Sequence, residues 1–259
     1  MAIERTGRST PEWDIRRLGI GVDLDGTFAD SHPYALAVMS QYLSQIRGEE
    51  VHLRVEDTLD WDLAKHPLVA DTPGAKEFLK QLYYERTDVF QNAVVYPGAL
   101  EVICDWRNQG YEVFFISGRV DQYGIGQATQ DWFKNLGLDW VVDENRLIIR
   151  SPGVTDLDFK LGMITRFNLQ VFIDDRPSTM RDFVADCLMI KILPAQPWNQ
   201  NELGISQAVF APDPRRFSQM GMIVDQSQGK GIGPDWRQID AYVQETAQWY
   251  YFLESFRVG

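Results

Sequence analysis

Residues 19–30 read Gly-Ile-Gly-Val-Asp-Leu-Asp-Gly-Thr-Phe-Ala-Asp, an apolar run that ends in two aspartates and a turn-forming glycine. Carboxylates at the end of a strand repel each other and resist desolvation. They therefore persist mainly where a cation or a chemical task holds them. Asp23 and Asp25 are accordingly the first candidates for a functional site.

Two further short apolar runs end in polar residues in the same way. The three runs cover residues 18–22, 112–116 and 170–173, and the second and third are followed by Ser117-Gly118-Arg119 and Asp174-Asp175-Arg176. Continuous apolar strands that alternate with helices indicate a parallel sheet covered on both faces, in which ligands bind beyond the carboxyl ends of the strands. The pattern predicts that all three polar clusters meet at one edge of the sheet.

The remaining periodicity predicts an α/β fold with a Rossmann-like parallel sheet and a small helical cap inserted after the first strand. Further strands are expected at 146–149 and 188–193, and helices at 33–47, 98–109, 122–136, 159–167 and 236–256. The expected domains are a polar arm (1–16), a catalytic core (17–30 and 97–195), a cap (31–96) and a C-terminal extension (196–259). The terminal helix of that extension would pack on the core or on a second subunit of a homodimer. The alternative for 31–96 is a longer helical layer packed on the sheet.

The composition narrows the range of partners and compartments. The 259 residues carry a formal net charge of −12, which disfavours nonspecific binding to nucleic acid or to an anionic membrane. Cys104 and Cys187 lack a Cys-x-x-Cys spacing, which is typical of a reducing compartment. No stretch approaches ~20 uninterrupted apolar residues, so we expect a cytoplasmic protein.

The spacing Asp23-x-Asp25 suits phosphoryl transfer. Side chains at i and i+2 lie on one side of a strand, so one carboxylate can act as nucleophile and metal ligand while the other acts as acid and base. A divalent cation must offset this negative charge, and Mg²⁺ suits a site made only of oxygen ligands. Gly26 allows the tight turn, and Thr27 offers a hydroxyl and backbone N–H groups to phosphate oxygens.

Four ordered motifs resemble those of the haloacid dehalogenase superfamily. They are Asp23-Leu24-Asp25-Gly26-Thr27, Ser117 in "FFISGR", Lys160 in "LDFKLGMI" and Asp174-Asp175 in "VFIDDRP". The resemblance implies a magnesium-dependent phosphatase in which Asp23 attacks phosphorus and Asp25 protonates the leaving oxygen and then activates water. It also implies that Ser117 hydrogen-bonds the phosphoryl group and that Lys160 neutralises charge. The expected metal ligands are Asp23, Asp25, Asp174 and Asp175, and the expected substrate-binding residues are Gly26, Thr27, Gly118 and Arg119.

Within that superfamily the chain is most similar to the 5'(3')-deoxyribonucleotidases, which implies a nucleoside monophosphate as substrate. The similarity extends to residues 96–106 ("YPGALEVICDW"), 197–200 ("PWNQ") and 235–239 ("DWRQI"). Residues 117–119, however, read Ser-Gly-Arg where that family tends to have Thr-Ser-Pro, and the Ser-Gly-Arg sequence resembles a phage polynucleotide 3'-phosphatase domain. Another small-molecule phosphatase and a noncatalytic nucleotide-binding protein remain as alternatives.

Aromatic residues of the expected cap could stack a nucleotide base or could form the core of the cap. The candidates are Trp61, Phe78, Tyr83, Tyr84 and Phe90.

Overall fold

We analysed a computed structural model of the chain, which describes residues 17–58, 60, 62–182, 190–199, 222–224 and 234–257. The expected polar arm at 1–16 lies outside the described residues, as do Trp61, Cys187 and most of the expected extension between 200 and 233.

A parallel sheet forms the centre of the fold, as the sequence predicted. Its described strands run in the order β5-β4-β1-β6-β7-β8, and every neighbouring pair is parallel. The strands are β1 (Gly19–Val22), β4 (Glu112–Val120), β5 (Leu147–Arg150), β6 (Val171–Ile173), β7 (Ile190–Leu193) and β8 (Met222–Val224). Because β1 lies between β4 and β6, the three polar clusters of the sequence occupy neighbouring positions.

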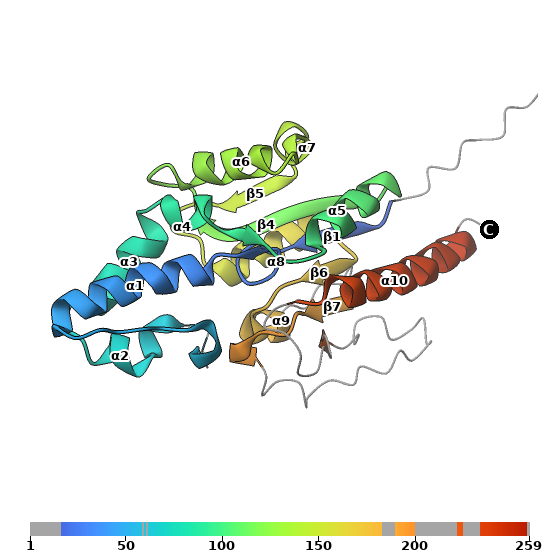
Figure 1. Ribbon diagram of the computed structural model, residues 1–259. Helices are drawn as coiled ribbons and strands as arrows, with labels where there is room; N and C mark the ends of the chain where they lie inside the picture. Colours follow the sequence, from blue (N-terminus) through green and yellow to red (C-terminus); the bar gives the residue numbers. More distant parts are fainter. Residues whose placement is uncertain are drawn as a thin grey trace, which may run out of the picture.

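Helices cover both faces of the sheet because successive strand residues point to opposite sides. Alternate residues such as Ile20 and Phe115 pack with α5 (Ala99–Asn108), α6 (Ile125–Asn135) and α10 (Trp236–Arg257). The residues between them, such as Phe114, pack with α8 (Asp156–Arg166) and α9 (Pro177–Asp182) on the other face. Figure 1 shows α5 and α10 in front of the sheet and α8 behind it.

Gly21 of β1 allows close packing on the second of these faces. A Cβ atom at this position would lie 2.6 Å from a ring carbon of Phe172 and 2.8 Å from a methyl carbon of Leu169. A larger residue would therefore displace the two strands that carry the aspartate clusters.

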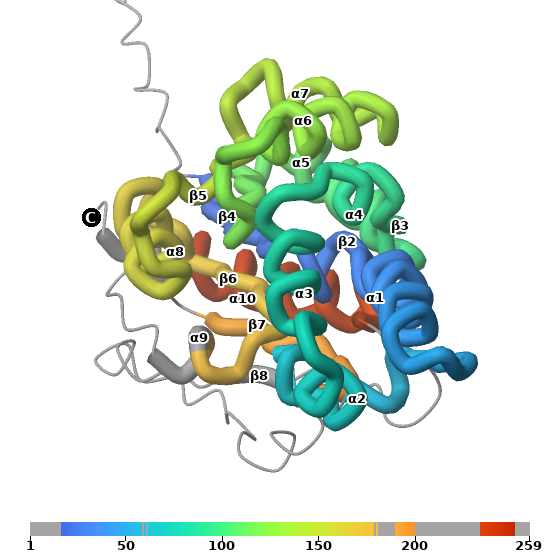
Figure 2. The backbone as a smooth tube through the Cα atoms, turned by 90° about the vertical axis from the view of Figure 1, so that its left-hand side faces the viewer, coloured from blue at the N-terminus to red at the C-terminus, as the bar shows by residue number. Residues whose placement is uncertain are grey.

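A helical segment leaves and re-enters the core next to β1. The short strands β2 (Ala29–Asp30) and β3 (Val94–Val95) pair antiparallel and join its two ends. Between them lie α1 (His32–Arg47), η1 (Val55–Asp57), η2 (Leu63–Lys65), α2 (Pro67–Ala70), α3 (Ala75–Tyr84) and α4 (Asp88–Gln91), which share an apolar cluster of their own. We refer to residues 31–96 as the cap segment. Figures 1 and 2 show its helices beyond the carboxyl ends of the strands.

Several elements differ in extent from the sequence-based expectation. β4 continues past Ile116 to Val120 because β5 pairs with both Ser117 and Val120, across a shift in register. α8 begins at Asp156, earlier than expected, because the hydroxyl of Thr155 accepts a hydrogen bond from the Asp158 N–H at 3.1 Å. The short helix α7 (Asp139–Asp143) was not expected.

The terminal helix α10 packs against the core. Trp236 and Ile239 are buried in the same apolar cluster as β1. The indole N–H of Trp106 donates to Asp240 at 2.7 Å, and that of Trp236 donates to the carbonyl of Thr27 at 3.2 Å. The end of the chain thus supports the turn that follows β1.

Candidate active site

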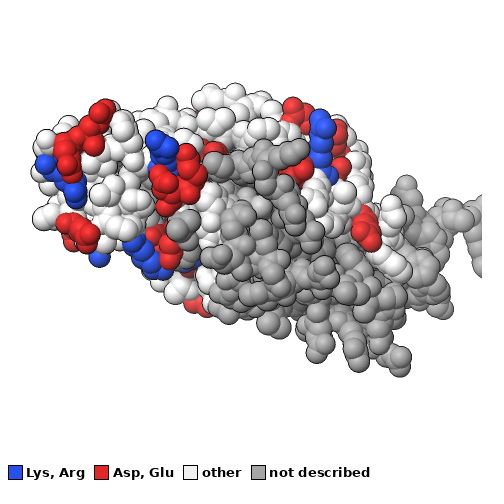
Figure 3. All heavy atoms as spheres, turned by 60° about the horizontal axis from the view of Figure 1, so that its bottom comes forward, with Lys and Arg blue, Asp and Glu red and all other residues white. Residues whose placement is uncertain are grey.

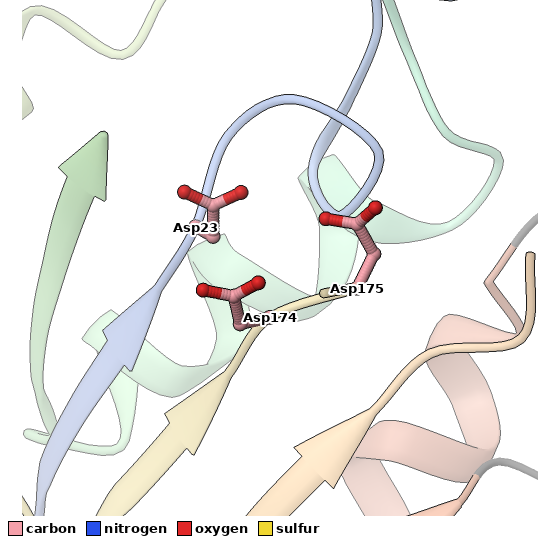
Figure 4. A group of neighbouring side chains, drawn as sticks. All are labelled: Asp23, Asp174 and Asp175. Carbon is pink, nitrogen blue, oxygen red and sulfur yellow. The ribbon is translucent and has the colours of Figure 1, made fainter. Parts of the chain in front are cut away.

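Three buried aspartates from two adjacent strands form the centre of the site. Asp23 follows β1, and Asp174 and Asp175 follow β6; each offers one oxygen, and these oxygens lie within 4.8 Å of one another. The backbone N–H of Asp23 donates to the carbonyl of Ile173 at 2.9 Å, which aligns the two strand ends. Figure 4 shows the carboxylates gathered beyond the arrowheads of the two strands.

Lys160 of α8 contacts two of these carboxylates directly. Its Nζ lies 2.7 Å from Asp174 Oδ2, 2.9 Å from Asp23 Oδ1 and 3.5 Å from Asp156 Oδ2. Burial alone would lower the pKa of Lys160, but the carboxylates of Asp174 and Asp23 outweigh it and raise this pKa well above its ordinary value. Lys160 is therefore a permanent positive charge at neutral pH.

One lysine does not balance the negative charge of the cluster. Burial raises the pKa of Asp23 well above its ordinary range; Lys160 opposes this shift, and Asp174 and Asp175 add to it. Burial and the neighbouring Asp174 raise the pKa of Asp175 to about 7. Burial and the described neighbours thus favour the neutral forms of Asp23 and Asp175, and a set of three carboxylates fits a hard divalent cation such as Mg²⁺.

Asp175 is held by groups from two separate segments, residues 26–27 and residues 198–199. The indole N–H of Trp198 donates to its Oδ2 at 2.9 Å, and the Asn199 amide donates to its backbone carbonyl at 3.0 Å. The backbone N–H of Asp175 donates to the hydroxyl of Thr27 at 3.0 Å. Gly26 has a φ of +81°, and a Cβ there would lie 2.6 Å from Asp175 Oδ2. Gly26 and Thr27 therefore shape the surroundings of Asp175.

Trp198 and Asn199 were not expected to support the site. The sequence marked them only as part of the segment 197–200, which lies more than 20 residues beyond Asp175. Gln196 also belongs to this support, since its side-chain amide donates to the carbonyl of Gly26 at 2.5 Å and to the hydroxyl oxygen of Tyr96 at 2.9 Å.

Asp25 lies outside the cluster of metal-type oxygens and is paired with Arg119. The guanidinium donates from Nε to Asp25 Oδ2 at 2.8 Å and from Nη2 to Oδ1 at 2.9 Å. Burial would raise the pKa of Asp25, but Arg119 outweighs it and holds this pKa below its ordinary value. Each of the two Asp25 oxygens accepts an N–H of Arg119, and Asp25 is not part of the group formed by Asp23, Asp174 and Asp175, so a metal contact of Asp25 stays a prediction.

Arg119 is itself locked in place, with 1 % of its side chain exposed. Its guanidinium carbon lies 4.2 Å from the ring centroid of Phe90 in the cap segment, and its Nη1 donates to the Thr129 hydroxyl at 3.1 Å. The expected substrate-binding residue thus links Asp25 to the cap segment.

Ser117 and Gly118 lie inside β4 rather than beyond its end. Ser117 is fully buried, and its hydroxyl oxygen accepts the backbone N–H of Arg119 at 3.2 Å. A Cβ on Gly118 would lie 2.5 Å from Asp156 Oδ1, so glycine permits the close approach of α8. Gly118 lines the cavity described next, together with Arg119.

A cavity of about 370 Å³ lies above the carboxylates and is shared by the core and the cap segment. Asp23, Asp25, Lys160, Asp174 and Asp175 line it on the core side. Of the aromatic candidates, Tyr83, Tyr84 and Phe90 line it, whereas Phe78 stacks on Tyr42 at 4.1 Å within the cap segment. His32 and Trp198 also line the cavity and stack on each other, with their centroids 4.5 Å apart.

His32 should make the folded state less stable at acid pH. Burial lowers the pKa of His32 from about 6.5 to about 4. Between these two pH values the unfolded chain binds a proton at His32 and the folded chain does not. The free energy of unfolding therefore falls as the pH decreases from about 6.5 through about 4. We expect wild type to lose about 2 kcal/mol more of its unfolding free energy than His32→Gln does when the pH is lowered from 7 to 5.

Urea unfolding of both proteins at a series of pH values measures this shift, because the other titrating groups are common to both. His52→Gln, which alters an exposed histidine, is the matched control. Parallel stability curves for wild type and His32→Gln would show that His32 is freely protonated in the folded protein.

Comparison with known proteins identifies the fold. No protein-family model matches the sequence. A solved structure described as a "predicted phosphatase" from Clostridium acetobutylicum superposes with a TM-score of 0.55 at 12% identity, covering 88% of this chain and 99% of that one. A haloacid dehalogenase family hydrolase from Deinococcus radiodurans, solved with bound phosphate and sodium, superposes with a TM-score of 0.51 at 15% identity, covering 90% and 97%.

Two curated relatives carry the name "Putative nucleotidase". The one from Bacillus cereus is 23% identical over 63% of this chain and 79% of its own length. The one from Oceanobacillus iheyensis is 22% identical over 73% of this chain and 93% of its own length.

The fold is that of the haloacid dehalogenase-like hydrolases, as the motifs predicted. The fold, the carboxylates at its strand ends and these relatives together support an enzyme of the phosphatase class. Among the described residues, no helix is long and apolar enough to cross a membrane.

Proposed function

We propose that this protein is a magnesium-dependent phosphomonoester hydrolase that forms an aspartyl-phosphate on Asp23 and releases phosphate from nucleoside monophosphates. The observation that carries the proposal is the position of Asp23. Its carboxylate lies at the floor of a cavity, 2.9 Å from the ammonium group of Lys160 and beside Asp174 and Asp175.

The donor set and the uncompensated charge support a metal ion at this floor. Asp23, Asp174 and Asp175 would hold Mg²⁺, which would offset their charge and polarise a phosphoryl oxygen. Trp198 and Thr27 orient Asp175 for this task through the hydrogen bonds described above.

The chain itself supplies the nucleophile and the proton transfers. A carboxylate oxygen of Asp23 bonds to phosphorus as the bond to the ester oxygen breaks, and water later breaks the acyl-phosphate bond to release inorganic phosphate. Asp25, kept ionised by Arg119, is the base that takes a proton from this water. To act first as the acid for the leaving oxygen, Asp25 needs a weaker contact with Arg119.

The cavity walls support a substrate with an aromatic part. Tyr83, Tyr84 and Phe90 come from the cap segment, and Trp198 comes from the C-terminal side. Ring faces of this kind can stack a nucleobase, and a concave, partly apolar pocket is the usual site for a small molecule. The curated relatives named as nucleotidases point the same way.

A nucleic-acid end is less well supported as substrate. On the face shown in Figure 3, the basic side chains of the described residues occur in small groups next to acidic ones. A groove that binds a polynucleotide backbone needs a continuous basic stripe.

A substrate panel tests the proposal. Phosphate release should be measured with a generic aryl phosphate, 5'- and 3'-nucleoside monophosphates and 3'-phosphorylated oligonucleotides, each with and without Mg²⁺. We expect metal-dependent turnover, with the highest kcat/KM on nucleoside monophosphates. Turnover only on oligonucleotide ends would overturn the substrate assignment, and no turnover with any divalent metal would favour a noncatalytic nucleotide-binding protein.

A further inference from the structure

Three basic side chains line the cavity without a carboxylate partner among the described residues. They are Lys76 and Lys80 of α3 and Arg150 of β5. Lys160 and Arg119, by contrast, are each paired with aspartates of the site. Unpaired cations around a cavity are notable in a chain whose formal net charge is −12.

The two lysines belong to the face of α3 that forms the cap wall of the cavity. Residues 76, 79, 80, 83 and 84 of this helix line it, which is the i, i+3, i+4, i+7, i+8 spacing of one helix face. Lys76 and Lys80 are i, i+4 neighbours, so their ammonium groups can bind one anionic group together.

Tyr83 shows which end of α3 lies near the catalytic aspartates. Tyr83, near the end of α3, lines the same cavity as Asp23 and Asp25, and its pKa is raised by burial and also by the negative charge of Asp25. At 1.5 Å per residue, Lys80 lies about 4.5 Å and Lys76 about 10.5 Å from Tyr83 along the helix axis. The lysine pair thus lies about one to two helical turns from Tyr83, along the face of α3 that lines the cavity.

Neighbouring acidic groups are engaged elsewhere. Asp62, which also lines the cavity, accepts the backbone N–H of Ala64 at 3.1 Å and so caps η2. Asp60 pairs with Lys65 at 2.7 Å. Arg150, whose side chain donates to the carbonyls of Gly118 at 3.0 Å and Val154 at 2.8 Å, is the other cation available to an anionic ligand.

We propose that Lys76 and Lys80 form a subsite for a second phosphate group, so that the preferred substrate is a nucleoside bisphosphate and one of its two phosphates reacts at Asp23. This inference rests on the proposed function and changes its preferred substrate from a nucleoside with one phosphate to a nucleoside with two. The flexible lysine stems can follow a second phosphate on the sugar, and they recognise it as point charges rather than through fixed geometry.

Direct binding tests the subsite separately from catalysis. Asp23→Asn protein with Mg²⁺ should be titrated by calorimetry with a nucleoside 3',5'-bisphosphate and with the matching 5'- and 3'-monophosphates. We expect the bisphosphate to bind about five- to tenfold more tightly than either, the effect of two exposed ionic contacts, and this ratio should shrink with added salt. Adding Lys76→Gln and Lys80→Gln should bring the ratio of bisphosphate to monophosphate affinity close to one. The control pair is Lys65→Gln and Lys134→Gln, two lysines outside the cavity lining, and it should leave this ratio unchanged.

The remaining outcomes separate the two proposals. Equal affinity for bisphosphate and monophosphates would overturn the subsite, and the proposed function would then depend on the hydrolysis panel alone. Loss of the bisphosphate preference in Arg150→Gln, with the preference retained when Lys76 and Lys80 are both replaced, would overturn the placement of the subsite on α3. Much tighter binding of a phosphorylated oligonucleotide than of the bisphosphate would overturn the proposal of a small substrate. Retained bisphosphate preference in a protein that hydrolyses no ester would contradict the proposed function while supporting the subsite.

Discussion

We expect Asp23→Asn to lower the rate of phosphate release by a factor on the order of 10⁴, because an amide oxygen is too weak a nucleophile to form the covalent intermediate. The fold should survive. The pKa of Asp23 is raised by burial and by Asp174 and Asp175, so a neutral side chain of the same shape removes a repulsion as well as one partner of Lys160. We expect the free energy of unfolding without metal to change by no more than about 1 kcal/mol.

Steady-state assays with aryl phosphate and Mg²⁺, together with urea unfolding followed by circular dichroism, measure both quantities. Asp131→Asn, which alters an exposed aspartate of α6, is the matched control and should keep full activity. Rapid quenching of wild type during turnover should also trap phosphate on Asp23. Activity within tenfold of wild type in Asp23→Asn would rule out this residue as the nucleophile.

Lys160→Met should lower both activity and stability. Lys160 contacts Asp23, Asp174 and Asp156, and removing one partner of a buried ion pair costs about 3–5 kcal/mol because the remaining charges lie buried and unpaired. We expect kcat to fall on the order of 10³-fold, since the negative charge of nucleophile and phosphate is no longer offset. In the absence of metal the unfolding midpoint should shift markedly to lower urea, and Mg²⁺ should recover part of the loss.

Lys191→Met is the matched control. Lys191 lies on β7, which pairs with β6, and it is outside the cavity lining. Its ammonium group donates to the carbonyl of Met180 at 2.7 Å. Lys191→Met should lose little activity. An unchanged free energy of unfolding in Lys160→Met would mean that protonation of the aspartates costs no stability. An unchanged kcat would show that Lys160 has no role in the reaction.

The strand ends were predictable because they depend on local pattern and on one general rule. Apolar runs that end in Asp23, Ser117 and Asp174 predicted parallel strands, and the carboxyl ends of parallel strands share an edge. The structure confirms the fold and brings Asp23, Lys160, Asp174 and Asp175 into contact. Their chemical roles stay predictions until the variants above are measured.

The partner of each charged group was not predictable. Arg119 could have reached a phosphate or a carboxylate of the cap, and it pairs instead with Asp25, which is 94 residues away in sequence. Trp198 reaches Asp175 from a segment 23 residues further on. The end of β4 also depended on a neighbour, since pairing with β5 carries the strand through Ser117 to Val120.

The sequence by itself determined the parallel sheet, the order of its motifs and the concentration of acidic oxygens at one edge, because continuous apolar runs that end in polar residues specify these features within short windows. Only the tertiary structure decided which carboxylates contact Lys160, which carboxylate Arg119 holds ionised, and which face of α3 lines the cavity. Those outcomes depend on distances and desolvation between segments far apart in the chain, where a shift of a few ångströms changes the electrostatic energy more than any local preference does.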